Sequence, residues 1–216
     1  PVISRPWGMN SWTPQTGKMG DGWQYSYQAN KIRGIKQTHQ PSPWINDYGQ
    51  FSLLPMTGKQ PIFDEEKRAS WFSHKAESAR PYAYEVYLAD YDTRVRMAPS
   101  ERAAVFEVEF SRTARQEERW IVVDAFDANS ELEQIDSYTL AGISRKNSGG
   151  VPANFANYFI VRFTEPIHRL VRQERKGKGG KHSLLAVNLS AGKQGTPTPF
   201  YAASSVLSRA LAQHTL

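Results

Sequence analysis

Apolar and polar side chains alternate most clearly over residues 84–110, which read YEVYLADYDTRVRMAPSERAAVFEVEF. Tyr84, Val86 and Leu88 fall on one side of an extended segment, and the same period of two recurs twice before Phe110. A period of two places alternate side chains on opposite faces of a β-strand, so each strand has one buried face and one wetter face. This stretch therefore predicts three consecutive half-buried strands.

Further strands are predicted on the C-terminal side of this stretch, with turn residues between them. The residues before position 80 read instead as turns and short extended pieces, because prolines and pairs such as Asp21-Gly22 interrupt them. The last nine residues predict the start of a helix with Ser208 as its N-cap. Short strands without intervening helices predict an all-β fold, one large antiparallel β-sandwich. The candidate strands cover residues 120–126, 138–143, 158–163, 183–189 and 199–206.

Composition excludes several classes of protein. The 216 residues are 39% hydrophobic and 12% aromatic, which is enough to form a core and excludes a disordered chain. The chain has no cysteine, which excludes disulfides and thiolate chemistry. It also has no apolar stretch long enough to span a membrane.

The net charge of +6 raises the possibility of nucleic-acid binding. Most of this excess lies in one stretch, residues 169–181, which contains six basic residues and one acidic residue. No aromatic residues are interleaved with these charges, as a stacking platform for single strands would need. We therefore interpret the stretch as a solvated loop and expect no nucleic-acid partner.

Four of the six tryptophans, Trp7, Trp12, Trp23 and Trp44, lie in the first fifty residues among polar and turn-forming neighbours. Such a residue can offer a flat apolar face with an N–H donor at its edge, which suits the C–H-rich face and hydroxylated edge of a sugar ring. The alternative is that these tryptophans only hold loops against the sandwich. The pattern favours sugar binding for the cluster, without deciding which tryptophans contact sugar.

Residues 38–49 read THQPSPWINDYG and form the second unusual segment. Its two prolines stiffen the chain, and His39, Gln40, Trp44 and Asp47 project from this frame. The usual catalytic signatures are missing, since no nucleophile elbow, phosphate-binding loop or metal-ligand histidine pair occurs. Asp124 lies in an apolar run, where we expect a structural hydrogen bond, so no pair of acid and base carboxylates is predicted.

These segments resemble glycoside hydrolase family 92. The resemblance covers roughly residues 1–165, fades over 171–191 and returns weakly at 203–208, and THQPSPW is its most specific string. Further matching strings are RPWGMN (5–10), WTPQTG (12–17), GDGWQY (20–25), IRGI (32–35), DYG (47–49), RASWFSH (68–74) and RKNSGGVP (145–152).

The resemblance implies an exo-acting, calcium-dependent α-mannosidase that removes terminal mannose from glycans with inversion. It implies an N-terminal sandwich of the supersandwich, galactose mutarotase-like type, followed by linker helices and an (α/α)₆ barrel. Residues 1–207 would be that sandwich without its first strand or so, and residues 208–216 would begin a linker helix. The catalytic carboxylates and calcium ligands would lie on the barrel, outside this chain. A periplasmic or secreted location is expected for a glycan-degrading enzyme.

On this resemblance, the tryptophans would pack against mannose, and His39 and Asp47 would hydrogen-bond its hydroxyls or neighbouring loops. The chain's partners would be a mannose-containing glycan and the barrel domain, and the chain alone would be inactive. The alternative function is a free-standing carbohydrate-binding module without catalysis. The residues expected to line the mannose pocket are Trp12, Trp23, His39, Gln40, Trp44, Asp47 and, as a weaker candidate, Asn147.

Overall fold

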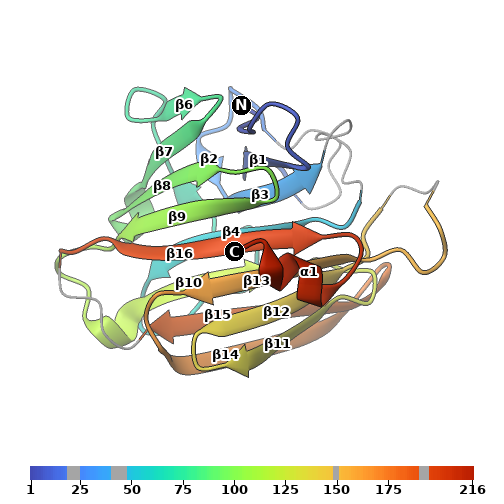
Figure 1. Cartoon of the computed structure of the whole chain (residues 1–216). Helices are drawn as coiled ribbons and strands as arrows, with labels where there is room; N and C mark the ends of the chain where they lie inside the picture. The colour runs from blue at the N-terminus through green and yellow to red at the C-terminus, as the bar shows by residue number, and fades with distance from the viewer. Residues whose placement is uncertain (19–24, 40–47, 148–150, 190–194) are drawn as a thin grey trace.

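A computed structural model describes residues 1–18, 25–39, 48–147, 151–189 and 195–216 (Figure 1). The described part is built from strands, with two 3₁₀ turns and one short helix. The strands are β1 (Asn10–Gln15), β2 (Lys31–Ile32), β3 (Gly34–His39), β4 (Phe51–Thr57), β5 (Ser70–Trp71), β6 (Ser78–Arg80), β7 (Ala83–Leu88), β8 (Thr93–Pro99), β9 (Ala103–Glu109), β10 (Arg119–Asp124), β11 (Glu131–Asp136), β12 (Thr139–Ser144), β13 (Asn157–Phe163), β14 (Ile167–Gly177), β15 (Gly180–Leu189) and β16 (Thr198–Ser205). The 3₁₀ turns are η1 (Ala89–Tyr91) and η2 (Gln116–Glu118), and the helix is α1 (Arg209–His214).

Two large antiparallel sheets face one another and form a β-sandwich, which confirms the predicted fold class. One sheet has six strands in the order β1-β3-β4-β10-β15-β14, and the other has eight in the order β11-β12-β13-β16-β9-β8-β7-β6. A small sheet of β2 and β5 accompanies them. The core lies between the large sheets, where the rings of Phe51 and Phe159 stack at 3.9 Å across the interface.

The alternation over residues 84–110 forms β7, β8 and β9, as predicted. Tyr84, Val86 and Leu88 are buried in the core, and the side chains between them face solvent on the outer side of the eight-stranded sheet. Burying a large apolar side chain contributes roughly 1.5–3 kcal/mol, so this face drives the pairing of the two sheets. The predicted C-terminal strands appear as β10, β12, β13, β15 and β16.

The first eighty residues contain more regular structure than the sequence predicted. β1, β3 and β4 form half of the six-stranded sheet, and every residue of β1 and β3 is buried. Both faces of these strands are covered, so polar residues such as Thr13 and Lys36 lie inside the molecule. The Nζ atom of Lys36 sits 4.8 Å from the ring centroid of Phe126. Because side chains on both faces of these strands are buried and several are polar, the sequence does not show the alternation of apolar and polar residues that marks a half-exposed strand.

The basic stretch is a hairpin, so the loop prediction for residues 169–181 was wrong. β14 and β15 pair from Ile167 to the tight turn at Lys178-Gly179. Gly180, the first residue of β15 after this turn, has a φ of 121°, which favours glycine. β14 is the edge strand and most of its side chains are exposed, so its charges are solvated as expected.

The helix α1 begins as predicted, with Ser208 as its N-cap and the Ser208 hydroxyl accepting a hydrogen bond from the Leu211 N–H at 3.2 Å. It lies on the outer face of the eight-stranded sheet, where Ala212 packs against Ala141 and Ile160. Among the described residues, no helix has the length and apolar character needed to cross a bilayer.

Candidate functional site

One end of the sandwich lies on the right in Figure 1, and we call it the loop end because the segment after β3 and the loop after β12 lie there. This end holds a buried network of amide and hydroxyl side chains. The Gln37 amide donates to Asn10 Oδ1 at 3.2 Å, and the Ser204 hydroxyl donates to the same oxygen at 3.0 Å. The Asn157 amide donates to Gln37 Oε1 at 3.1 Å. Asn10 and Gln37 belong to the six-stranded sheet, while Asn157 and Ser204 belong to the eight-stranded sheet. The network therefore joins the two sheets at this end.

His39 is the last residue of β3 and lies beside this network. Its side chain is almost fully buried, and the Gln37 amide nitrogen is 3.1 Å from its Nε2 atom. Burial lowers the pKa of His39 to about 4, and hydrogen bonds with the backbone of Met9, Tyr48 and Gly49 oppose this shift only in part. The imidazole is therefore neutral near pH 7 and serves as a hydrogen-bonding group rather than a charge.

The residues on either side of the 40–47 segment are fixed to the same end of the sandwich. The Gly49 N–H donates to the Lys146 carbonyl at 2.6 Å, and the Asn157 amide donates to the Gly49 carbonyl. Gly49 has a φ of 69°, and a Cβ atom there would lie 2.5 Å from the Ser144 carbonyl oxygen. The position therefore requires glycine, because both its φ and the space around it exclude a side chain.

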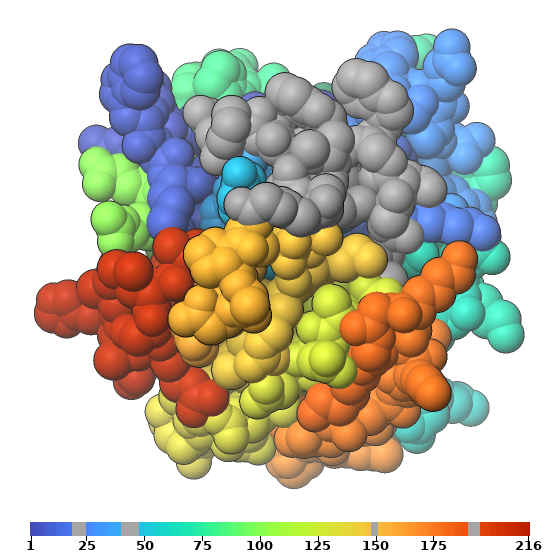
Figure 2. Space-filling view, turned by 90° about the vertical axis from the view of Figure 1, so that its right-hand side faces the viewer, coloured from blue at the N-terminus to red at the C-terminus, as the bar shows by residue number. Residues whose placement is uncertain are grey.

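Segments that are far apart in the sequence therefore lie together at this end of the sandwich. His39 precedes the 40–47 segment, Tyr48 follows it, and Lys146 belongs to the loop after β12. Figure 2 looks onto this end, with the C-terminal residues and the β14–β15 hairpin on opposite sides of the 151–157 segment. Loops positioned by a rigid scaffold commonly carry binding residues.

The predicted pocket residues fall into three groups. Trp12 is fully buried, and its ring packs between Phe51 and Phe106 at centroid distances of 5.8 and 5.2 Å. It therefore braces the core, and its predicted contact with sugar is corrected because no part of its side chain is accessible. His39 and Asn147 lie at the loop end of the sandwich, and the Asn147 amide donates to the Arg145 carbonyl at 2.8 Å. Trp23, Gln40, Trp44 and Asp47 lie outside the described residues.

The sequence did not reveal Asn10, Gln37 or Asn157 as part of this end. Each carries an amide side chain that is buried within a strand, and the sequence shows only that these residues are polar. Asn157 Oδ1 is also buried without a hydrogen-bond partner among the described residues. The hydrogen bonds that the other groups of the network do make fix side-chain geometry more strictly than apolar packing does.

A second buried polar cluster lies on the outer side of the six-stranded sheet. The Arg68 guanidinium donates to Asp124 Oδ2 at 2.7 Å, and His182 Nε2 donates to Asp124 Oδ1 at 2.6 Å. Burial alone would raise the pKa of Asp124, but the charge of Arg68 and the His182 hydrogen bond outweigh it and hold this pKa well below its usual range. A carboxylate held ionised in this way cannot donate a proton near neutral pH, and its structural hydrogen bonding confirms the sequence interpretation.

No site for a divalent cation emerges from the part of the chain that the structure describes. Calcium prefers six to eight oxygen ligands, several of them carboxylates. Within the described ranges, no three histidine or carboxylate side chains come close enough together to hold a metal ion.

Comparisons with known proteins agree with this architecture. The family model for the glycosyl hydrolase family 92 N-terminal domain matches residues 1–195. The family GH92 inverting mannosidase BT2199 from Bacteroides thetaiotaomicron is 35% identical, with a TM-score of 0.88. The match covers 99% of this chain and 29% of BT2199.

The fold is shared more widely than the sequence. The family GH92 α-mannosidase BT3965 from the same organism is 24% identical, with a TM-score of 0.79, over 99% of this chain and 32% of that protein. This chain therefore spans about a third of the length of these mannosidases. A comparison with curated proteins found no match. From the family match and the 35% identity to BT2199, the chain belongs to glycosyl hydrolase family 92, whose N-terminal domain it matches.

Proposed function

We propose that this chain is the N-terminal domain of an α-mannosidase that hydrolyses terminal α-mannosides with inversion. The observation that carries the proposal is the 35% identity to an inverting mannosidase, which extends over 99% of this chain. The loop end of the sandwich would then line one side of the mannose pocket. A periplasmic or secreted location would suit this activity.

In this proposal, His39 positions the pocket and does not react. Its neutral, buried imidazole and the clamped Gly49 fix both ends of the 40–47 segment. That segment carries Gln40, Trp44 and Asp47, which would contact the sugar. We assign Trp23 and Asn147 to the same pocket. An apolar ring against one sugar face, with polar groups at its edge, would orient the mannose.

The acid and base of the reaction would come from a second domain. Inversion needs a carboxylic acid and a carboxylate roughly 6.5–9.5 Å apart, with room between them for a sugar and a water molecule. Asp124 is buried in an ion pair with Arg68 and a hydrogen bond with His182, and is unsuited to either role. We propose that both carboxylates and the calcium ligands belong to a C-terminal (α/α)₆ barrel that packs beside the loop end.

The test measures mannose release from an α-mannobioside by this chain alone, by the chain co-expressed with a family 92 barrel domain, and by the pair after addition of a calcium chelator. We expect release only from the untreated pair. In the pair, Trp44→Ala should reduce release strongly, while the matched control Trp71→Ala, an exposed tryptophan on β5, should not.

Release by the chain alone would contradict the proposed division of labour. If Trp44→Ala and Trp71→Ala behave alike, the loop end is not part of the pocket. Mannose binding by the chain without any release from the pair would favour a binding module instead.

A further inference from the structure

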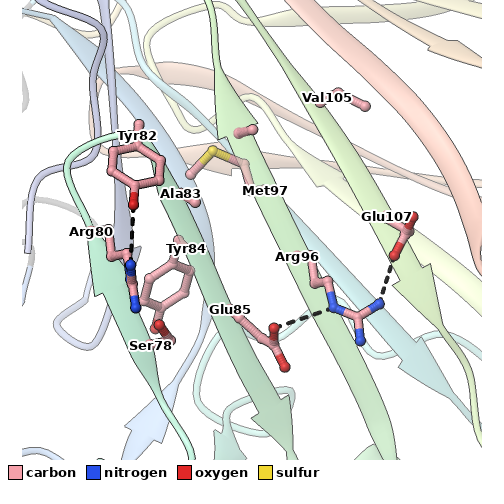
Figure 3. Close-up of a pocket in the computed structure, with 11 residues that line it drawn as sticks. Ser78, Arg80, Tyr82, Ala83, Tyr84, Glu85, Arg96, Met97, Val105 and Glu107 are labelled. Atoms are coloured by element: carbon pink, nitrogen blue, oxygen red, sulfur yellow. Dashed lines mark hydrogen bonds and ion pairs between the residues drawn. The ribbon is translucent and has the colours of Figure 1, made fainter.

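The outer face of the eight-stranded sheet carries a hollow (Figure 3). The hollow has a volume of about 440 Å³ and extends over β6, β7, β8 and β9. This volume lies within the range of about 300–1,000 Å³ that is usual for small-molecule sites. The helix α1 lies farther along the same face, on β13 and β16.

The strand register explains why the sheet is hollowed here. Tyr84 on β7 pairs with Met97 on β8, which makes Ala83 and Ala98 the next residues along these two strands, and Ala98 pairs with Val105 on β9. Two methyl side chains in neighbouring strands leave a low apolar floor between taller neighbours. Val105 continues this row toward Tyr201 on β16.

Two tyrosines flank this apolar floor. Tyr82, at the turn before β7, is 63% exposed and lines the hollow, and Tyr201 is 39% exposed. Three strand spacings of roughly 4.8 Å separate β7 from β16, so the backbone of Tyr201 lies roughly 14 Å from that of Ala83, the residue after Tyr82. The Arg80 guanidinium donates to the Tyr82 hydroxyl at 3.1 Å and steadies that ring.

A row of charged side chains borders the floor on one side. Arg96 donates to Glu85 Oε2 at 3.2 Å and to Glu107 Oε1 at 2.6 Å, as Figure 3 shows. Glu107 Oε2 has no partner among the described residues and can accept a further hydrogen bond. Because these ion pairs already fix the side chains, a ligand would lose little entropy in ordering them.

We propose that this hollow and the neighbouring Tyr201, which together we call the tyrosine trough, bind a neutral oligosaccharide of two or three sugar units. The hollow contributes Arg80, Tyr82, Ala83, Glu85, Arg96, Ala98, Val105 and Glu107, and Tyr201 lies beside Val105 on the next strand. The trough carries two basic and two acidic groups, so it favours neither an anion nor a cation. Its apolar floor and aromatic ends match the C–H-rich face of a pyranose, and its charged border matches the hydroxylated edge.

The test is a calorimetric titration of the chain with mannobiose, with cellobiose and with galacturonic acid as a charged control. We expect at least one neutral disaccharide to bind with millimolar affinity and galacturonic acid not to bind. Tyr82→Ala and Tyr201→Ala should each weaken that binding about tenfold. Tyr138→Ala, which removes a tyrosine 40% exposed at the far side of the same sheet, should leave it unchanged. Thermal unfolding of each variant checks that it is folded.

The proposal is overturned if neither disaccharide binds, or if Tyr82→Ala binds like the unaltered chain while folded. It is also overturned if Tyr82→Ala instead abolishes a concentration-dependent dimer, since the face would then be an interface between copies. The proposal that the trough binds sugar is independent of the proposed mannosidase function. Failure of mannose release would leave the calorimetric result standing, and trough variants should not alter release from a small mannoside.

Discussion

Removal of the buried carboxylate of Asp124 should destabilise the chain severely. The side chains of Asp124 and Arg68 are only 2% and 1% exposed, so an Asp124→Ala variant leaves a guanidinium charge buried without its counter-ion. Two carbonyl contacts of Arg68 remain, to Arg33 at 3.1 Å and Phe63 at 3.0 Å, but neither carries a charge. Breaking a buried ion pair from one side costs about 3–5 kcal/mol.

This cost is a large share of the about 5–15 kcal/mol that stabilises a typical domain. In a chain of this size, 1 kcal/mol corresponds to roughly 2–4 °C, so the melting temperature should fall by roughly 6–20 °C. Urea unfolding followed by tryptophan fluorescence measures the free energy directly. As a matched control, Glu131→Gln breaks the exposed pair with Arg145 and should leave the midpoint unchanged.

A double variant separates the charge from the volume of the side chain. Arg68→Met with Asp124→Leu removes both charges, so it should recover most of the lost stability. The reasoning is refuted if Asp124→Ala costs less than about 1 kcal/mol, the net value of an ordinary hydrogen bond. It is equally refuted if the double variant is no more stable than the single one.

Three further predictions concern other parts of the molecule. The pKa of His39 is lowered to about 4 in the folded chain, against 6.5 in the unfolded chain. Between these pH values the unfolded chain therefore binds a proton at His39 and the folded chain does not. The free energy of unfolding should therefore fall by about 3 kcal/mol in total as pH drops from about 6.5 to about 4. Urea titrations at several pH values should show a smaller dependence of this free energy on pH in His39→Gln. An equal dependence in the variant would contradict the lowered pKa of His39. Gly142→Ala places a Cβ atom 2.1 Å from the Phe159 ring, so it should cost about 1–3 kcal/mol; an unchanged urea midpoint would mean that the ring moves aside without cost. Ser208→Ala removes the cap on the Leu211 N–H and should cost about 1 kcal/mol. Faster amide exchange confined to α1 would report this loss, and unchanged exchange would contradict it.

The parts of the fold that the sequence predicted are those with one face in water. β7, β8 and β9 alternate because their outer side chains, such as Glu85 and Arg96, are solvated. β1 and β3 carry no such signal because both of their faces are covered. Lys36 illustrates the difficulty, since a lysine reads as exposed but is fully buried in this fold.

The edge strand β14 was not predicted for a different reason, which is that most of its side chains are exposed. β14 packs only Ile167, Leu170 and Val171 against the core and is otherwise mainly polar and charged, so it reads as a loop although its backbone pairs with β15. For the candidate site, the sequence predicted His39 and its proline-rich neighbours, and the structure describes His39 alone among them, as a buried residue at the end of β3. It could not separate the buried Trp12 from the fully exposed Trp7, because burial of a tryptophan depends on strands distant in sequence.

Under the proposed function, the buried amide network would let this domain hold the geometry of a substrate pocket without supplying the acid or the base. Groups that orient a substrate must be held within a fraction of an ångström, and loops alone are too mobile for this. Asn157 and Gln37 connect the two sheets directly beneath the residues that flank the 40–47 segment. Apolar residues at these positions could match the stability of the network, but they would not fix which backbone groups meet there. We infer that the polar end of this sandwich exists to hold loop geometry, while the Phe51–Phe159 stack and its neighbours hold the fold.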